Sequence, residues 1–194
     1  MSNLPTTADD ILACARDLVV AGGYNGFSYA DVAEVVGIRK PSIHHHFPTK
    51  GELVRALVTR HREQTRAGIE QLEARFQDPR ELLRAYTGHW KACIKDASMP
   101  FCVCALLASE LPVLPAEVAI EVKAYFRFLS TWLTSVLERG RREGRVRLTN
   151  SPRVEAEGFM ATVHGAMLSA RAYDDPKVFG TITDPLIDRL SGSR

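Results

Sequence analysis

The sequence lacks several features that define other classes of protein. No apolar run approaches the roughly 18 residues that a membrane-spanning helix needs, and neither a low-complexity tract nor a repeat of fixed period is present. The chain starts with polar residues, and Asp9 and Asp10 interrupt any apolar stretch, so no secretory leader is recognised. We therefore expect a globular protein of the cytoplasm that does not associate with a membrane.

Enzyme motifs are also absent. The sequence has no glycine-rich loop that would cradle a phosphate, no HExxH metal motif and no nucleophile elbow. These absences predict a protein that is not an enzyme and that carries no cofactor. Because the cytoplasm is a reducing compartment, we expect the four cysteines to be free thiols rather than a disulfide framework. They are Cys14, Cys93, Cys102 and Cys104.

Helical periodicity is present in nearly every long segment, whereas no persistent alternation with a period of two occurs. A chain of 194 residues, 45% of them hydrophobic, can bury a core without disulfides or metals. The sequence thus predicts an all-α fold of about nine helices. Three small helices form an N-terminal helix-turn-helix head, and a larger helical bundle follows.

Capping residues and glycines set the expected helix ends. The first helix follows Thr7 and ends at Gly22 and Gly23, and the second opens at Ser28 and stops at Gly37. The expected ranges of the later helices are 40–46, 49–75, 79–96, 102–111, 115–143, 152–173 and 176–190. We assign residues 1–48 to the head and 49–194 to the body, with 49–75 as the connector.

Positive charge is concentrated in one part of the chain. The overall net charge is only +2, but residues 36–66 hold seven bases and two acids, a local net charge of +5. The bases are Arg39, Lys40, Lys50, Arg55, Arg60, Arg62 and Arg66. A basic zone within a nearly neutral chain is typical of a protein in which one part meets phosphate, although a solvated charged face has the same composition.

The segment from Ser28 to Glu52 has the residues of two helices that cross steeply through a tight turn. Ala33 leaves room for the second helix to approach, and Gly37 supplies the backbone conformation of the turn. Ile38 and Ile43 anchor both helices to a core. In such a unit the N-terminal end of the second helix enters the major groove of DNA.

This segment and its flanking helices resemble the TetR family of transcriptional regulators over about residues 7–60. The matching residues are Gly22-Gly23-Tyr24, the helix from Ser28 to Gly37, Lys40-Pro41-Ser42-Ile43 closing on Phe47, and Pro48-Thr49-Lys50-Gly51-Glu52-Leu53. The resemblance implies a homodimer, a double-stranded DNA operator with two half-sites, and a C-terminal pocket for a small-molecule inducer.

Candidate DNA-binding residues follow from the motif and the resemblance: Ser28, Tyr29, Arg39, Lys40, Pro41, Ser42, His44, His45 and Lys50. Arg39 and its neighbours at the start of the recognition helix can reach base edges. Lys50 resembles a family lysine that contacts phosphate at the start of the fourth helix. His44 occupies the position of a family tyrosine that touches phosphate, and a neutral histidine can still donate one hydrogen bond there.

The run His44-His45-His46 also raises the possibility of a metal site. Consecutive residues of a helix point about 100° apart, so three neighbours do not converge on one ion. We therefore expect no metal and assign these histidines to DNA contact or ordinary packing.

The body concentrates large aromatic side chains that suit either a packed core or a pocket for a hydrophobic small molecule. The candidate ligand-binding residues are Tyr86, His89, Trp90, Phe101, Cys102, Tyr125, Phe128, Phe159 and His164. The nature of the inducer is not encoded in any recognisable motif.

Cys102 supports an alternative. The run from Phe101 to Glu110 resembles a helix that opens with a cysteine in electrophile-responsive TetR repressors, and a thiol at a helix N-terminus is favoured as thiolate. The chain is therefore expected to be a ligand-released repressor. A thiol-based redox or electrophile sensor using Cys102, or an activator of the same fold, is the alternative.

Dimerisation is expected through the helix 152–173 and the C-terminal segment. Small residues there, Ala161, Gly165, Ala166 and Ser169, permit close approach of two helices, and Val154, Val163, Met167 and Tyr173 supply apolar area. Ligand in the body would then change the separation of the two heads.

Overall fold

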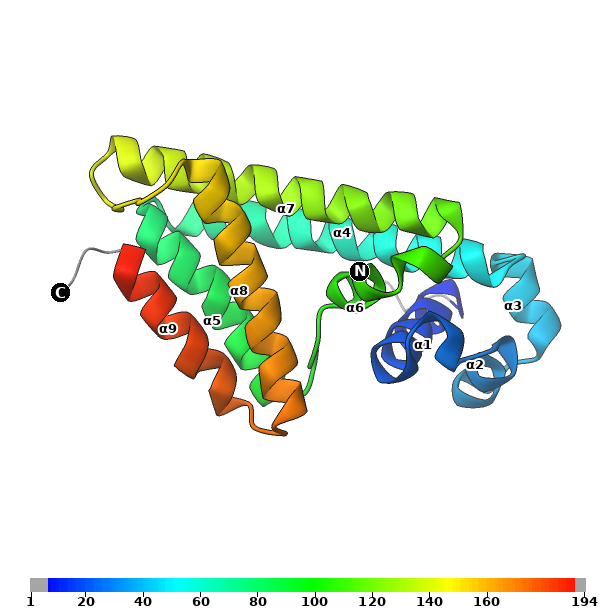
Figure 1. The fold of residues 1–194 in the computed structure, drawn as a ribbon. Helices are drawn as coiled ribbons and strands as arrows, with labels where there is room; N and C mark the ends of the chain where they lie inside the picture. The colour runs from blue at the N-terminus through cyan, green and yellow to red at the C-terminus, as the bar shows by residue number, and fades with distance from the viewer. Residues whose placement is uncertain (1–6, 191–194) are drawn as a thin grey trace. The chain divides into compact units, whose positions relative to one another are not determined.

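A computed structural model describes residues 7–190 of the chain, and every regular element in that range is helical (Figure 1). The nine α-helices of these residues are α1 (Thr7–Gly22), α2 (Tyr29–Val36), α3 (Lys40–His46), α4 (Lys50–Arg75), α5 (Pro79–Lys95), α6 (Val103–Ser109), α7 (Ala116–Arg142), α8 (Pro152–Ala172) and α9 (Lys177–Leu190). Two short 3₁₀ turns, η1 (Tyr24–Gly26) and η2 (Leu111–Val113), lie between them. The all-α prediction is confirmed.

Most helix ends lie where the sequence predicted them, and the largest difference is at α6. A helix over 102–111 was expected, but α6 begins at Val103 and ends at Ser109, and the chain continues as η2. Pro112 lies inside η2, and proline cannot donate the backbone hydrogen bond that would extend an α-helix. Cys102 therefore precedes the helix rather than opening it.

The described chain divides into two compact units. The first comprises the residues up to Gln64 together with Val103–Tyr125, and the second comprises Thr65–Cys102 together with the chain from Phe126 onward. The long helices α4 and α7 each contribute residues to both units.

In the first unit, α1 packs against α2, α3 and α6 (Figure 1). Ile11, Val19, Val32 and Ile43, one or two from each of the three head helices, are fully buried. Such burial contributes about 1.5–3 kcal/mol for each large aliphatic side chain. The head is therefore fixed by a small shared core.

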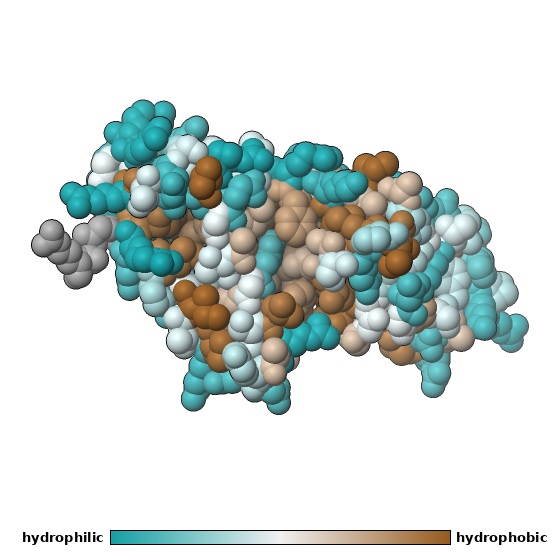
Figure 2. Space-filling model, in the orientation of Figure 1, coloured by the Kyte–Doolittle hydropathy of each residue, from teal (hydrophilic) through white to brown (hydrophobic). Residues whose placement is uncertain are grey.

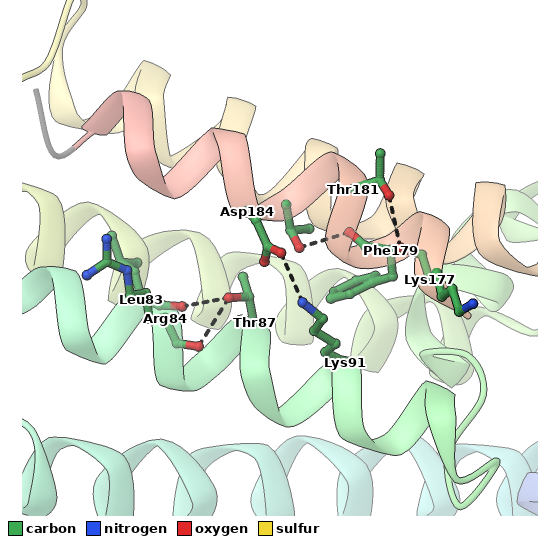
Figure 3. Close-up of polar contacts among 9 residues, drawn as sticks. Leu83, Arg84, Thr87, Lys91, Lys177, Phe179, Thr181 and Asp184 are labelled. Carbon is green, nitrogen blue, oxygen red and sulfur yellow. Dashed lines mark hydrogen bonds and ion pairs between the residues drawn. The ribbon is translucent and has the colours of Figure 1, made fainter. Parts of the chain in front are cut away.

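In the second unit, α9 packs against α8 and α5 (Figure 1). The Lys91 ammonium of α5 donates to the Asp184 carboxylate of α9 (Figure 3), and the two atoms are 2.9 Å apart. Arg84 of α5 lies 3.5 Å from Asp188 of α9. Both ion pairs are exposed, so each contributes at most about 1 kcal/mol. The firm attachment of α9 comes instead from its buried face, which includes Phe179 and Ile187.

Two further observations concern chemistry along the described chain. All four cysteines are free thiols, as expected, and Cys14, Cys102 and Cys104 are buried. Within residues 7–190 no helix has the length and apolarity needed to cross a membrane.

Candidate nucleic-acid interface

The helix-turn-helix is held by local hydrogen bonds at each helix end. At α2, the Ser28 side chain accepts from the Ala30 N–H, and the Asp31 carboxylate accepts from the Ser28 N–H and hydroxyl. At the other end Gly37 has φ 73° and ψ 33°, a left-handed conformation that glycine adopts without steric cost. These features set the direction in which the chain leaves α2 toward α3.

Helix α4 has an equivalent start. The Glu52 carboxylate accepts from the Thr49 N–H, and the Glu52 N–H donates to the Thr49 hydroxyl, which forms a complete capping box. The helices on both sides of α3 are therefore secured by their own ends, independently of α3.

Helix α3 presents almost its whole surface to solvent. Ile43 is fully buried, whereas the rest of the helix up to His46 and the preceding Arg39 are exposed. Arg39 occupies the N-cap position without a side-chain capping bond, so its guanidinium is not used to close the helix. A short helix held by one buried side chain can offer its remaining side chains to a partner.

A hollow of about 400 Å³, here called the cationic hollow, opens between α2, α3 and the start of α4. Its lining residues are Phe27, Ser28, Tyr29, Ala30, Lys40, His44 and Lys50. The lining includes two lysines and the N-terminal end of α2, and both favour an anion.

Lys50 lies along the wall of the cationic hollow. Its ammonium donates to the Phe27 carbonyl and lies 4.3 Å from the centre of the Phe27 ring and 4.9 Å from that of Tyr24. Burial lowers the pKa of Lys50, while the charges of Asp31 and Glu110 oppose that effect. The amine is thus already partnered inside the protein.

Tyr29 and His44 also line the cationic hollow, and they contact each other. The Tyr29 hydroxyl donates to the Phe47 carbonyl at 2.7 Å, and burial, with help from Glu52 and Tyr24, raises its pKa to about 12. The His44 ring packs edge-on against Tyr29, with ring centres 4.8 Å apart. His44 Nδ1 lies 3.0 Å from the Pro48 carbonyl oxygen.

The structure brings the predicted DNA-binding residues together. Five of the nine line the cationic hollow, and the other four are exposed on or beside α3: Arg39, Pro41, Ser42 and His45. Sequence reasoning missed Phe27 and Ala30, which complete the lining. A hydrophobic residue just before a helix N-cap, as Phe27 is, was the available signal.

Sequence reasoning also missed a hydrogen bond that links the head to the residue after α6, here called the Glu110 clasp. The Glu110 carboxylate accepts from the Tyr24 N–H at 2.7 Å. The adjacent Gly23 has φ 76° and ψ −174°, a conformation that is essentially restricted to glycine. A Cβ atom on Gly23 would lie 2.0 Å from Glu110 Oε1, so the clasp requires glycine for two reasons.

The body contains a dense aromatic core. Tyr86 is buried, and its ring centre lies 5.3 Å from that of Trp132 and 6.5 Å from that of Phe159. Burial raises the pKa of Tyr86, with a further increase from Cys102, although a hydrogen bond with Trp90 opposes the effect. The predicted residues Tyr86, Trp90, Cys102 and Phe159 therefore share one core.

The other predicted ligand-binding residues have different surroundings. The His89 ring packs edge-on against Trp90 of this core, with ring centres 5.9 Å apart. His89 is exposed, with Nε2 3.7 Å from the Cys93 thiol, and Phe128 lies under Arg66, with the guanidinium 5.2 Å from the ring centre. Phe101 contacts Arg171 in the same way at 5.5 Å. Tyr125 belongs to the first unit, where its ring faces His61.

His164 has an unusual environment. Its ring packs edge-on against Phe126, with centres 5.3 Å apart, and its Nε2 is buried without a hydrogen-bond partner. A buried polar atom without a partner destabilises the folded state by about 1–3 kcal/mol. Among the described histidines, cysteines and carboxylates, no group of three or more is arranged to hold a metal ion.

Two family models match this chain, one in its N-terminal part and one in its C-terminal part. A model described as bacterial regulatory proteins of the tetR family matches residues 11–57. A model described as the tetracyclin repressor-like C-terminal domain matches residues 79–184. Together they cover the helix-turn-helix and most of the body.

Solved structures with this fold include a TetR-family transcriptional regulator from Agrobacterium tumefaciens. It is 61% identical, with 96% of this chain and 98% of that chain covered and a TM-score of 0.94. A TetR transcriptional regulator from Legionella pneumophila is 25% identical, with 97% and 100% covered and a TM-score of 0.88.

A curated relative is the HTH-type transcriptional activator FasR of Mycolicibacterium smegmatis, 32% identical over 75 residues. That match covers 39% of this chain, and it spans about a third (34%) of the length of the relative.

Proposed function

Because the chain belongs to the TetR family of bacterial transcriptional regulators, we propose that it is a repressor that a small, mostly apolar inducer releases from a palindromic operator. Family members are DNA-binding transcription factors rather than enzymes, which agrees with the sequence prediction. They bind DNA operators as homodimers. The proposed site of action is the cytoplasm, where bacterial DNA lies.

The observation that carries the DNA-binding assignment is the exposed basic surface of α3 beside the cationic hollow. Arg39 and Lys40 stand at the first turn of a helix of which only Ile43 is buried. An arginine at such a position can bind guanine through two hydrogen bonds, and a lysine in an anion-binding hollow can meet phosphate. We assign base reading to Arg39 and phosphate contact to Lys40.

Replacing Lys40 with alanine is expected to weaken operator binding about tenfold and to reduce the salt dependence by about one phosphate, because one ion contact is lost. Arg39→Ala should weaken binding by about tenfold or more and relax the choice of sequence at one base pair. The measurement is a salt titration of the dissociation constant on a duplex selected from random sequences. Lys177→Ala, which removes an exposed charge at the start of α9, is the matched control. Unchanged affinity in both head variants would remove α3 from the interface.

Dimerisation is assigned to one face of α8. The exposed residues along this face are Val154, Gly158, Ala161, Gly165, Leu168 and Ala172. Their spacing alternates between four and three residues, which is the spacing of a helix-helix seam. Val154 is 55% and Leu168 58% exposed in the single subunit, so this face carries apolar surface that a second α8 could cover. Figure 2 shows mostly brown, tan and pale groups along α8.

This face omits five of the eight residues that were expected from the sequence and adds three others. The omitted residues are Val163, Ala166, Met167, Ser169 and Tyr173, and the added ones are Gly158, Leu168 and Ala172. Val163, Ala166 and Met167 were expected to contribute to the dimer, but all three are buried within their own subunit. The two glycines on the exposed face have open space where a side chain would be. Open space at Gly158 and Gly165 supports close approach of a second α8.

For the inducer we propose a mostly apolar molecule with one hydrogen-bonding group. The aromatic core around Tyr86 supplies the apolar surroundings, and the unpartnered Nε2 of His164 supplies a polar partner. The chain's two tryptophans, Trp90 and Trp132, are buried in the second unit. Titration with medium-chain fatty acids and aromatic acids should therefore change the tryptophan fluorescence. A library of such compounds that neither changes fluorescence nor releases DNA would contradict this proposal.

The Glu110 clasp offers a route by which the body can act on the head. Phe101 and Cys102 lie in the second unit, α6 follows directly, and Glu110 at its far end binds the Tyr24 N–H in the head. A ligand that displaces the residues before α6 would move the clasp and change the placement of the head. By linkage, operator binding then weakens ligand binding by the same factor.

Repression follows in the simplest way from this arrangement, since a dimer on an operator blocks access of other proteins to the promoter. Activation is the second candidate, because the relative FasR is an activator by name. Deleting the gene and measuring transcripts from the operator-bearing promoter separates the two: repression predicts a rise and activation predicts a fall.

The alternative of a thiol-based sensor has two candidate cysteines. Cys102 is fully buried, whereas Cys93 is half-exposed and lies beside His89.

A further inference from the structure

His44 is placed to contact an anion in the cationic hollow. It is exposed on α3 and lines the hollow together with Lys40, Lys50 and the first turn of α2. The residue on its own helix that is one turn earlier is Lys40, so two basic side chains of α3 border the same space. A DNA phosphate that enters the hollow therefore meets the His44 ring.

The ring is held in one orientation by its Nδ1 atom. This atom lies 3.0 Å from the Pro48 carbonyl oxygen, which can only accept a hydrogen bond. We therefore assign the proton of the neutral ring to Nδ1, and Nε2 is then an acceptor without a proton. The neutral ring has then used its one N–H on the Pro48 carbonyl, and its other nitrogen carries a lone pair. With this assignment the neutral ring has no second N–H for the phosphate contact that was expected from the sequence.

A second proton on the ring reverses this polarity. Nε2–H becomes a donor, the ring becomes a cation, and the hydrogen bond to Pro48 is retained. Only the doubly protonated ring can thus bind a phosphate oxygen in this orientation.

The other ionisable groups around His44 do not gain or lose a proton near neutral pH in a way that would change phosphate binding. Asp31 is held by Ser28, and these hydrogen bonds lower its pKa, so it stays ionised. Glu52 at the start of α4 is engaged by Thr49, and the Tyr29 phenol, with a pKa of about 12, keeps its proton on the Phe47 carbonyl. Lys50 donates to Phe27. His45 and His46, also exposed on α3, are not among the residues that line the hollow.

We propose that His44 makes operator binding pH-dependent, with affinity rising as the ring takes up its second proton and donates Nε2–H to a backbone phosphate. This inference rests on the proposed DNA-binding function and adds a regulatory input to it. Complex formation through the doubly protonated ring is then linked to proton uptake by each head.

The test uses the full-length protein and a duplex selected from random sequences, at constant ionic strength. The dissociation constant should fall about tenfold between about pH 8 and about pH 6, because one charge-assisted hydrogen bond forms. His44→Asn keeps a donor for Pro48 but has no atom at the Nε2 position, so its binding should be weak and independent of pH. His44→Lys carries a fixed charge, so its binding should be tight and equally independent of pH. His45→Gln is the matched control and should retain the wild-type response.

A second measurement isolates the proton. Calorimetric titration in two buffers of different ionisation enthalpy should show proton uptake in the wild type and in His45→Gln, but none in His44→Asn. If the wild type binds the duplex with no pH response, or if His44→Asn retains it, the inference about His44 is wrong although the protein still binds DNA. If no duplex is selected at either pH, the proposed function itself fails.

Discussion

Gly165→Leu is expected to convert the protein to a monomer and to weaken operator binding about a hundredfold to ten-thousandfold, because the two heads no longer bind as a linked pair. Gly165 lies in the middle of the exposed α8 face, and nothing within its own subunit would contact an added side chain. A leucine side chain at this position would fill the space into which the second α8 has to pack, so it prevents the two helices from approaching. Sedimentation velocity and a DNA-binding titration measure the two effects.

The same substitution should stabilise the single subunit, which separates it from ordinary damage to the fold. Leucine is favoured over glycine within a helix by about 0.8–1 kcal/mol. The reference is a second monomeric variant, Leu168→Glu, which places a charge on the same face without improving the helix. Gly165→Leu should therefore unfold at higher urea than Leu168→Glu. Gly88→Leu, at an exposed helical glycine of α5 with equally open surroundings, should leave the dimer intact. A dimeric Gly165→Leu protein would place the interface elsewhere.

Gly23→Ala is expected to destabilise the head by about 2.5–6 kcal/mol, a large part of the stability of a typical domain. An alanine would be strained at φ 76° and ψ −174°, which costs about 1–3 kcal/mol. Its Cβ would also force Glu110 away from the Tyr24 N–H, and such a charged hydrogen bond contributes about 1.5–3 kcal/mol. Urea unfolding followed by circular dichroism measures the sum.

A double-mutant cycle separates the two contributions. In a Glu110→Ala background the collision is absent, so Gly23→Ala should then show only the backbone strain, about 1–3 kcal/mol. Gly22→Ala is the matched control, since nothing lies near its missing side chain and its backbone is helical. Equal effects of Gly23→Ala with and without Glu110 would mean that the clasp contributes nothing to the head.

The helix ends were predictable from the sequence because each depends on residues within a few positions of one another. The Ser28–Asp31 and Thr49–Glu52 boxes and the turn at Gly37 are of this kind. The aromatic core was predictable as a set for a similar reason, since large apolar residues at helical spacing rarely remain exposed. Membership of Tyr125 was harder to predict. Periodicity indicates which face of the 27-residue α7 is buried but not which partner each turn meets, and Tyr125 meets His61.

Contacts between distant positions were not predictable in this way. Glu110 and Tyr24 are 86 residues apart, and the sequence around each residue does not indicate that the other is its partner. The burial of Cys102 was missed for a related reason. The argument for a reactive thiol used the dipole of a helix that begins one residue later, and it took no account of the surrounding core. Reactivity of a thiol depends on access as well as on charge.

The independent capping of α2 and α4 also bears on how this protein can evolve. Since Ile43 is the buried residue of α3 and the neighbouring helices close on their own ends, exchanging the exposed residues of α3 removes few interactions that hold the head together. Exposed substitutions of this kind usually change stability by less than about 0.5 kcal/mol. Mutations that redirect the protein to a new operator can therefore accumulate without first passing through unfolded intermediates, and the recognition helix can diverge after gene duplication while the rest of the head is retained.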